Sequence, residues 1–304
     1  MKTALITGAH GFIGRHLARQ LADKGVKVCG LGHGAWPDAG EWGVSVWQNG
    51  EISQSNLERL LSISDTPDAI FHLAGGSSVG LSLQTPEEDF QRSAVSTSRL
   101  LEWARKRAPQ ARLVLSSSAA VYGDGHFAPI KEDVPCKPFS PYGYNKRIAE
   151  LLFESYSRNF GMHTAVVRLF SVYGAGLRKQ LLWDLCTRLK NGSETVTLSG
   201  SGSERRDWLS VHDAAAYLIG VSRLENRKFL VVNGGCGLAV DVGQIARYVC
   251  EIWGNGTKVE FDGAPRSGDP MFLVADTTLG RSIGLAPKTE WRKGIKEYIE
   301  WFQS

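Results

Sequence analysis

The sequence lacks the patterns that mark metal sites, disulfide frameworks and membrane spans. Its 304 residues include five widely separated cysteines with no CxxC pair, and its seven histidines show no HxxxH spacing. A zinc site and a disulfide-stabilised fold are therefore not expected, and unpaired thiols favour a reducing cytoplasm. No apolar run approaches the ~18 residues that a membrane-spanning helix needs, and no charged-then-apolar leader precedes the first predicted strand.

The sequence also lacks a strong excess of one charge. The 35 Lys and Arg residues nearly balance the 31 Asp and Glu residues, which leaves a net charge of +4. The densest basic stretch, residues 105–107, ends a predicted helix, where cations oppose the negative end of the helix dipole. We therefore expect neither a nucleic-acid partner nor a membrane partner.

Short apolar runs alternate with helical patterns in the first half of the chain. Strands are expected at residues 2–7, 26–31, 44–48, 69–73, 113–116 and 164–169, and helices at 13–24, 55–63, 86–107 and 143–160. This alternation is typical of an α/β fold with a doubly wound parallel sheet covered on both faces. After Gly174 the alternation is lost, and helices near 178–190, 211–223, 241–253 and 292–303 are separated by irregular stretches.

A glycine-rich turn joins the first strand to the first helix. Gly8, Gly11 and Gly14 have a GxxGxxG spacing, with Phe12 and Ile13 at the start of the helix. Glycines permit a tight turn and close approach to a pyrophosphate, and the helix N-terminus offers N–H groups to that anion. We therefore expect a Rossmann-type dinucleotide-binding domain over residues 1–171. A smaller C-terminal α/β lobe for the substrate is expected over 172–304, with some segments returning to the first domain.

The end of the second strand bears on the choice of cofactor. An NAD-binding domain has Asp or Glu there to bind the ribose 2′-hydroxyl, whereas this chain has Gly32 followed by His33. Since no carboxylate would repel a 2′-phosphate, we expect NADP(H) rather than NAD(H), although no arginine follows nearby in the sequence. Glu51 and Ile52 follow the third strand, where an acidic side chain could accept a hydrogen bond from the adenine amino group.

Tyr142 and Lys146 form a YxxxK pair at the start of a predicted helix. A spacing of four places both side chains on one helical face, and an ammonium beside a phenol is expected to lower the tyrosine pKa. Ser116 and Ser118 end a strand, where a hydroxyl can hydrogen-bond the reacting oxygen. The pattern therefore predicts acid–base chemistry on a hydroxyl or carbonyl group.

These motifs resemble the extended short-chain dehydrogenase/reductase family, also called the NAD-dependent epimerase/dehydratase family, over about residues 1–270. The matching segments are TGAHGFIG at 7–14, HLAG at 72–75, LSSSAAVYG at 115–123, SPYGYNK at 140–146, RLFSVYG at 168–174, RRDWLSVHD at 205–213 and RSGDP at 266–270. The resemblance implies a dinucleotide-dependent enzyme that acts on a nucleotide-linked sugar.

The resemblance also implies roles for individual residues. It makes Ser118, Tyr142 and Lys146 the catalytic triad. It places along the cofactor Leu73, Ala74, Gly75, Ser116, Phe170 and Val172. The residues expected to bind substrate are Ser78, Ser118, Ser171, Arg206 and Arg266. Arginine suits the diphosphate because its planar fork pairs with two phosphate oxygens.

Departures from the family pattern narrow the reaction. Ala119 and Ala120 stand where 4,6-dehydratases have Asp-Glu, and the GDP-fucose synthase type has cysteine at the second position, so both activities are disfavoured. Ser171 and Ser93 replace asparagines that are usual in the family. Two reactions remain: reduction of a nucleotide-4-keto-6-deoxyhexose, which we favour, and 4-epimerisation of a UDP-hexose or UDP-N-acetylhexosamine with tightly bound NAD.

Two further possibilities concern the protein's role and assembly. A catalytically silent dinucleotide sensor is the alternative from another class, but an intact Ser-Tyr-Lys set argues against it. Predicted helices near 90–107 and 143–160 could pair across a two-fold axis, so we expect a homodimer. Their apolar faces could equally be buried against the sheet.

Overall fold

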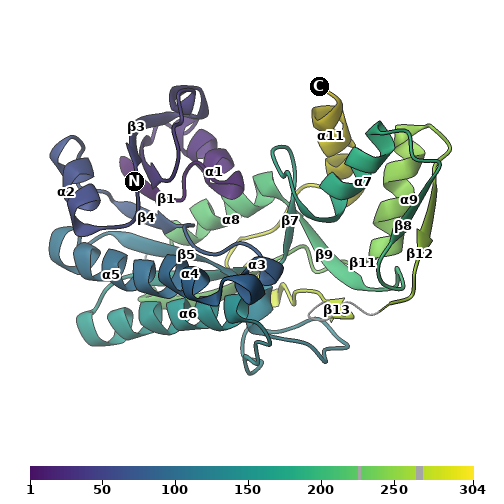
Figure 1. Ribbon diagram of the computed structural model, residues 1–304. Helices are drawn as coiled ribbons and strands as arrows, with labels where there is room; N and C mark the ends of the chain where they lie inside the picture. Colours follow the sequence, from purple (N-terminus) through teal and green to yellow (C-terminus); the bar gives the residue numbers. More distant parts are fainter. Residues whose placement is uncertain (225–226, 265–269) are drawn as a thin grey trace. The chain divides into compact units, whose positions relative to one another are not determined.

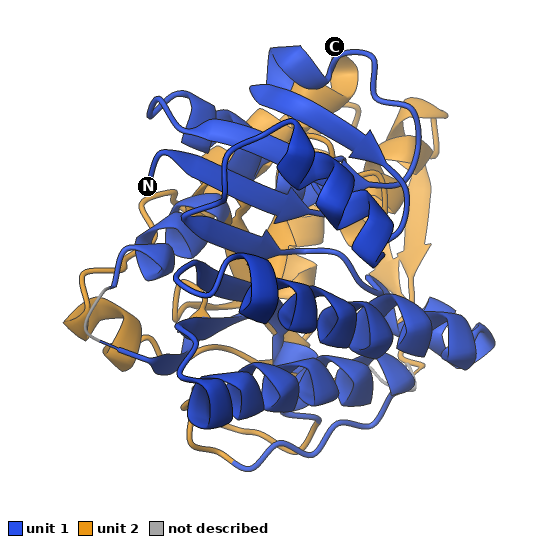
Figure 2. Ribbon diagram, turned by 90° about the vertical axis from the view of Figure 1, so that its left-hand side faces the viewer, with its two compact units in different colours: residues 1–123, 135–169, 215–233 blue, residues 124–134, 170–214, 234–304 orange. Residues whose placement is uncertain are grey.

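The computed structural model describes residues 1–224, 227–264 and 270–304. The chain divides into two compact units, coloured separately in Figure 2. Unit 1 comprises residues 1–123, 135–169 and 215–233, and unit 2 comprises residues 124–134, 170–214 and 234–304. The boundary between residues 169 and 170 therefore lies two residues before the one expected after residue 171. The segment 124–134, which was assigned to the first domain, belongs to unit 2.

Unit 1 contains a seven-stranded sheet (Figure 1). Its strands are β1 (Thr3–Thr7), β2 (Lys27–Gly32), β3 (Val44–Asn49), β4 (Ala69–His72), β5 (Arg112–Ser118), β6 (Thr164–Leu169) and β10 (Phe229–Gly234). The strand order is β10-β6-β5-β4-β1-β2-β3, and β1 to β6 pair in parallel. The order reverses between β1 and β4, as in dinucleotide-binding folds. The expected doubly wound α/β fold is confirmed.

Helices cover both faces of this sheet. They are α1 (Phe12–Ala22), α2 (Gln54–Ser62), α3 (Val79–Gln84), α4 (Pro86–Phe90), α5 (Ser96–Arg107), α6 (Pro141–Phe160) and α8 (Val211–Ser222), which begins in unit 2. Shorter helical turns are η1 (Ala39–Trp42), the π-helical η2 (Gln91–Val95) and η3 (Ala119–Val121). The predicted helix over 86–107 is therefore α4, η2 and α5 in succession.

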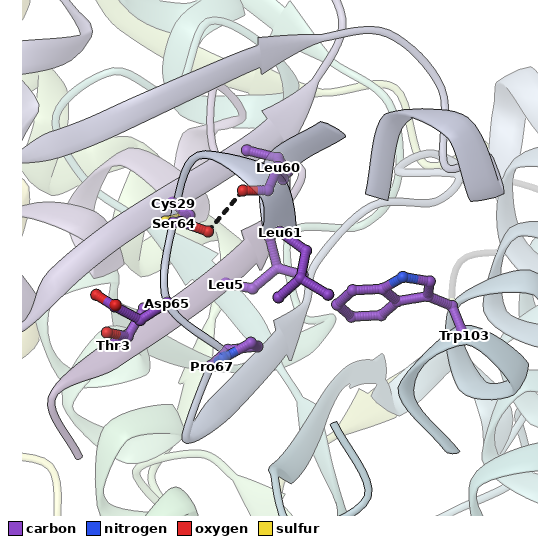
Figure 3. A pocket seen from close by; sticks show the side chains of 9 residues that line it. All are labelled: Thr3, Leu5, Cys29, Leu60, Leu61, Ser64, Asp65, Pro67 and Trp103. Atoms are coloured by element: carbon purple, nitrogen blue, oxygen red, sulfur yellow. Dashed lines mark hydrogen bonds between the residues drawn. The ribbon is translucent and has the colours of Figure 1, made fainter. Parts of the chain in front are cut away.

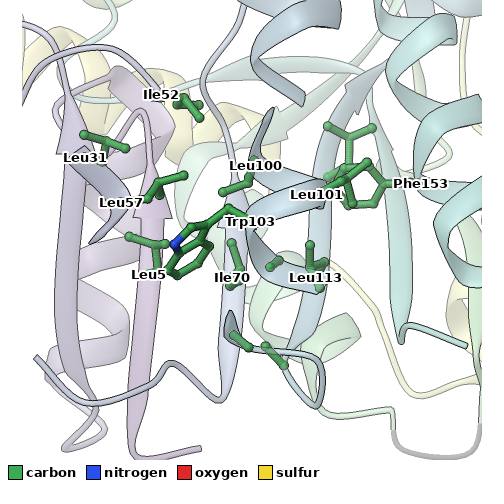
Figure 4. Packing of buried hydrophobic residues seen from close by; sticks show 14 of the residues in the cluster. Leu5, Leu31, Ile52, Leu57, Ile70, Leu100, Leu101, Trp103, Leu113 and Phe153 are labelled. Atoms are coloured by element: carbon green, nitrogen blue, oxygen red, sulfur yellow. The ribbon is translucent and has the colours of Figure 1, made fainter. Parts of the chain in front are cut away.

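One face of the sheet packs against α2, α5 and α6 (Figure 4). Leu5, Ile70 and Leu113 from three neighbouring strands meet Trp103 of α5 and Phe153 of α6 in one buried cluster. Burying a side chain of this size contributes roughly 1.5–3 kcal/mol. The cluster therefore fixes α6, which contains the predicted Tyr-Lys pair, against the sheet.

Local sequence sets where α6 begins and ends. Ser140 is the N-cap, and its hydroxyl accepts a hydrogen bond from the Gly143 N–H at 3.2 Å. Pro141 follows at the first helical position, where its missing N–H costs nothing. Gly161 ends the helix with φ of 69°, a conformation that glycine adopts without strain. The helix therefore starts one residue before Tyr142.

Unit 2 has its own short strands and helices. The strands are β7 (Ser171–Tyr173), β8 (Thr195–Leu198), β9 (Arg205–Ser210), β11 (Ala239–Asp241), β12 (Lys258–Phe261) and β13 (Phe272–Leu273); the helices are α7 (Gln180–Lys190), α9 (Val242–Trp253), α10 (Thr278–Ser282) and α11 (Trp291–Gln303). In one sheet β11, β13 and β7 all pair with β9, while β12 pairs with β8. No helix in the described ranges is long and apolar enough to cross a membrane.

Candidate active site

The parallel strands of unit 1 bring the predicted cofactor and catalytic segments to one edge of the sheet. The glycine turn follows β1, Gly32 ends β2, Leu73 follows β4 and Ser118 ends β5. Because parallel strands all finish at the same edge, these segments lie side by side where open α/β sheets bind their ligands.

The glycine turn is too crowded for side chains. A Cβ on Gly8, whose φ is +75°, would lie 2.7 Å from the Ala74 nitrogen, and a Cβ on Gly14 would lie 2.2 Å from the Gly8 carbonyl oxygen. Gly11 is the N-cap of α1 and provides no side-chain cap. The first turn of α1 therefore presents backbone N–H groups to the edge of the sheet, which fits a dinucleotide pyrophosphate.

His72 links the glycine turn to α5 from the end of β4. Its Nδ1 lies 2.7 Å from Thr7 Oγ1, and its Nε2 lies 2.8 Å from Thr97 Oγ1. Burial, followed by the nearby Lys146 charge, lowers the pKa of His72 to about 3, so the ring is neutral near pH 7. This fixed bridge positions Leu73 and the loop after it beside Gly8.

Gly32 lies against Trp47, which gives a steric reason for the missing carboxylate. A Cβ on Gly32 would lie 3.0 Å from the Trp47 ring. The indole N–H of Trp47 donates to the Gly34 carbonyl at 3.3 Å, and the Gly34 N–H donates to Asn49 Oδ1 at 2.9 Å. The residue at position 32 is therefore constrained by an aromatic ring on β3.

An arginine also lies beside the loop after β2, although the sequence suggested none. Arg15 of α1 donates to the His10 carbonyl at 3.0 Å, and its guanidinium lies 5.9 Å from the centre of the Trp36 ring. His10 stacks on Trp36 at 4.7 Å, and its Nδ1 lies 3.3 Å from the His33 carbonyl oxygen. The loop thus has a cationic and aromatic lining.

Glu51 and Ile52 differ in exposure. The Glu51 side chain is 66% exposed and pairs with Arg99 at 3.3 Å, whereas Ile52 is buried in the cluster beneath α2. A contact between Glu51 and the adenine amino group stays a prediction.

The structure brings Ser118, Tyr142 and Lys146 together. Ser118 ends β5, and its hydroxyl is hydrogen-bonded to Tyr142 and accepts from the Ala120 N–H at 3.2 Å. Lys146 Nζ lies 5.8 Å from the centre of the Tyr142 ring and donates to the Ser116 carbonyl at 3.1 Å. Serine, phenol and ammonium therefore form one group at the carboxyl edge of the sheet.

The pKa of Tyr142 differs from the sequence-based expectation. Burial raises the pKa of Tyr142, the hydrogen bond with Ser118 lowers it, and the Asp89 charge raises it further. The net shift of the Tyr142 pKa is upward, so the prediction of a lowered pKa is wrong, because burying a phenolate costs more than the hydrogen bond with Ser118 returns. Burial also lowers the pKa of Lys146 to about 8, against the opposing charges of Asp89 and Glu150.

A buried ion pair supports this group from behind. Glu150, two turns after Tyr142 on α6, accepts from Arg168 Nε at 3.0 Å and Nη2 at 2.8 Å, and from the Ser117 hydroxyl at 2.6 Å. The same guanidinium donates to the Tyr122 hydroxyl at 3.0 Å. These bonds join α6 to β5 and β6 next to Ser116 and Ser118. None of the sequence motifs pointed to Glu150, although its four-residue spacing from Lys146 on one helix could have indicated it.

The predicted substrate and nicotinamide residues are distributed over both units. In unit 1, Ser78 is the N-cap of α3 and accepts from the Leu81 N–H at 3.3 Å. Ser118 also lies in unit 1. The others lie in unit 2 or outside the described residues: Phe170, which is buried; Ser171 and Val172 on β7; Arg206 on β9, which is 8% exposed; and Arg266, which lies outside them. Their binding roles stay predictions.

A small hollow in unit 1 lies at the amino ends of the parallel strands, whereas Ser118 and the glycine turn lie at their carboxyl ends (Figure 3). Thr3 and Pro67, at the amino ends of β1 and β4, line it together with Cys29 and Trp103. It has room for about one water molecule. It is therefore too small for the predicted ligands. The described part of the chain contains no cluster of three or more His, Cys, Asp or Glu side chains that could hold a metal ion.

Comparison with known proteins identifies the family. Residues 4–231 match the model of the NAD dependent epimerase/dehydratase family. The chain belongs to this family. The resemblance based on sequence motifs is thus confirmed, as is the expectation of a dinucleotide-dependent enzyme.

Relatives in the epimerase/dehydratase family match the chain over nearly its whole length. UDP-glucose 4-epimerase of Azospirillum brasilense is 29% identical, over 99% of this chain and 92% of its own. The structure of MoeE5 in complex with UDP-glucuronic acid and NAD is 30% identical with a TM-score of 0.89, and covers 99% of both chains. UDP-glucose 4-epimerase of Thermotoga maritima with UDP-glucose is 27% identical with a TM-score of 0.89, over 99% of this chain and 98% of its own.

Proposed function

We propose that this chain is a 4-epimerase of a UDP-linked sugar that works with bound NAD. The observation that carries the proposal is the grouping of Ser118, Tyr142 and Lys146 beside the glycine turn, at one edge of the sheet. Relatives named UDP-glucose 4-epimerase support it along 99% of the chain. A neighbour named an NDP-hexosamine 5,6-dehydratase has the same fold, so fold alone does not select the reaction.

The residues of the chain account for the proton transfers of an epimerase. A bound nicotinamide ring supplies a hydride acceptor and, when oxidised, a positive charge. As a phenolate, formed when the phenol proton leaves to solvent, Tyr142 would accept the proton of the sugar 4-hydroxyl and later return it to the ketone oxygen. Ser118 hydrogen-bonds the same oxygen, and the Lys146 ammonium stabilises the phenolate. Arg206 of unit 2 is proposed to bind the diphosphate.

The 4-keto sugar reductase that we favoured from the sequence has no specific support among the relatives. Its basis was the missing carboxylate at Gly32, which suggested NADP(H). Trp47 provides another reason for glycine at this position, and a related structure contains NAD. We therefore propose NAD as the cofactor. The chain has Ala119 and Ala120 where the 4,6-dehydratases have an Asp-Glu pair, so it lacks the acid and base for eliminating water.

A homodimer is part of the proposal. Helices α5 and α6 lie side by side in Figure 1, and their inner faces pack on the sheet. On α6, Leu151 and Phe160 are 47% and 54% exposed. Apolar side chains on an outer helical face suit a contact with a second copy. Sedimentation that gives only monomer at micromolar concentration would refute the dimer.

The reaction can be tested with the purified full-length chain. UDP-glucose, UDP-N-acetylglucosamine and UDP-glucuronic acid are incubated separately without added cofactor, and the sugar signals are followed by NMR. We expect the 4-epimer of at least one sugar, and no conversion by Tyr142→Phe. If no epimer forms, while a nucleotide-4-keto sugar is reduced at the expense of added NADH or NADPH, the reductase is correct.

A further inference from the structure

A buried carboxylate lies beside the catalytic pair, and neither the sequence motifs nor the proposed reaction uses it. Asp89 of α4 is 6% exposed. Its Oδ2 accepts a hydrogen bond at 2.7 Å from Nδ2 of Asn145, the residue before Lys146 on α6. The carboxylate is therefore attached to the turn of α6 that contains Tyr142 and Lys146.

The loop after β4 brings Asp89 and Lys146 to neighbouring positions. A Cβ on Gly76 would lie 1.7 Å from Asp89 Oδ1, and a Cβ on Gly75 would lie 3.4 Å from Lys146 Nζ. The Gly76 N–H donates to Ser93 Oγ at 2.9 Å, which fixes the loop to η2. Carboxylate and ammonium thus contact adjacent glycines, and the absence of side chains there lets both groups approach.

A buried carboxylate with one side-chain hydrogen bond needs a counter-charge. Glu150 is the second carboxylate near Lys146, but it is already engaged by Arg168 and the partly exposed Arg147.

The remaining titratable groups around the ammonium are uncharged near neutral pH. His72 on β4 is neutral, and Tyr142 is a phenol whose pKa is raised. Asp89 and Glu150 are the carboxylates whose charges act on Lys146, and within the described residues Asp89 is the one that forms no ion pair with an arginine.

We propose that Asp89 is a positioning residue for the Tyr142–Lys146 pair. Its buried negative charge favours the protonated ammonium beside the loop after β4 and opposes ionisation of the Tyr142 phenol. The pKa shifts agree in direction, because the Asp89 charge raises the pKa of both Lys146 and Tyr142. The inference rests on the proposed function only in calling this pair catalytic.

The test is an NMR titration of the full-length chain labelled with ¹³C at the lysine ε and tyrosine ζ carbons. Lys146→Arg and Tyr142→Phe assign the two signals. In Asp89→Asn we expect Lys146 to titrate below its parent value of about 8, and Tyr142 to titrate below its own parent value. Glu88→Gln is the matched control, because Glu88 lies on the same helix but is 51% exposed and pairs with Arg92. In Glu88→Gln the Lys146 and Tyr142 signals should titrate as they do in the parent.

A second variant keeps the Asp89 charge but removes the hydrogen bond that Asn145 donates to it. Asn145→Ala should place the Lys146 pKa between those of the parent and Asp89→Asn. The proposal is overturned if Asp89→Asn folds and both the Lys146 and the Tyr142 signals titrate as in the parent. If Asp89→Asn does not fold, a Lys146 pKa in Asn145→Ala equal to that of the parent overturns it.

Activity gives an independent measurement. The alkaline limb of the kcat–pH profile should move to lower pH in Asp89→Asn but not in Glu88→Gln. If the NMR shifts appear while no UDP-sugar is epimerised, the proposed function fails and the role of Asp89 in the titration stands.

Discussion

Replacing Glu150 by glutamine would leave the Arg168 guanidinium buried without its counter-charge. The two side chains are 1% and 3% exposed, and they are joined by two hydrogen bonds of 3.0 and 2.8 Å. Removing one partner of a buried ion pair costs about 3–5 kcal/mol, because the remaining charge keeps its desolvation penalty. We expect the free energy of unfolding to fall by about that amount in Glu150→Gln.

Urea unfolding, followed by both tryptophan fluorescence and circular dichroism, measures this loss. Glu154→Gln on the same helix is the control, because its partner Arg158 is 72% exposed and such solvent-accessible pairs contribute roughly 0–1 kcal/mol. The double variant Glu150→Leu/Arg168→Met should be less destabilised than Glu150→Gln, since it buries no unpaired charge. The reasoning is refuted if Glu150→Gln loses no more stability than Glu154→Gln.

Three further predictions concern the cofactor turn and the buried titratable groups. Gly14→Ala places a Cβ 2.2 Å from the Gly8 oxygen; it should cost roughly 1–3 kcal/mol and abolish NAD binding measured by calorimetry, and unchanged affinity would contradict the assigned turn. His72 has a folded pKa of about 3 against 6.5, so the unfolded state binds the extra proton between these values. The free energy of unfolding should therefore decrease as the pH is lowered below 6.5, and more steeply in the parent than in His72→Asn. Parallel curves for the two proteins would show that His72 is not buried in the neutral form. The folded pKa of Lys146 is about 8 against 10.5, so stability should rise between pH 8 and 10 in the parent but not in Lys146→Met, and equal slopes would show that Lys146 is solvated.

Much of unit 1 could be predicted because its strands and helices are long and periodic. Buried strands such as β1 (TALIT) and β6 (TAVVRL) are mostly apolar, and α6 has a clear cap at each end. The strands of unit 2 were missed because all of them except β9 have only two to four residues, too few to show a clear pattern in the sequence. β9, for example, begins with two arginines, and β13 has two residues. Their stability comes from pairing between distant segments rather than from local preference.

The candidate site divides in the same way. Fixed spacing revealed the glycine turn and the Tyr142–Lys146 pair, because each lies on one local element. Asp89 and Trp47 act through tertiary contacts with Gly76 and Gly32, which no spacing in the sequence reports. The direction of the Tyr142 pKa was also beyond the sequence, since burial outweighs the charges nearby.

The most direct test of C4 chemistry at Tyr142 is epimerisation of a UDP-hexose in D₂O, with the C4 hydrogen followed by NMR. We predict that the product keeps its original hydrogen at C4, because only the hydroxyl proton passes through Tyr142 to solvent-exchangeable positions, and that Tyr142→Phe forms no product. Deuterium at C4, or undiminished turnover by Tyr142→Phe, would contradict the role given to this residue.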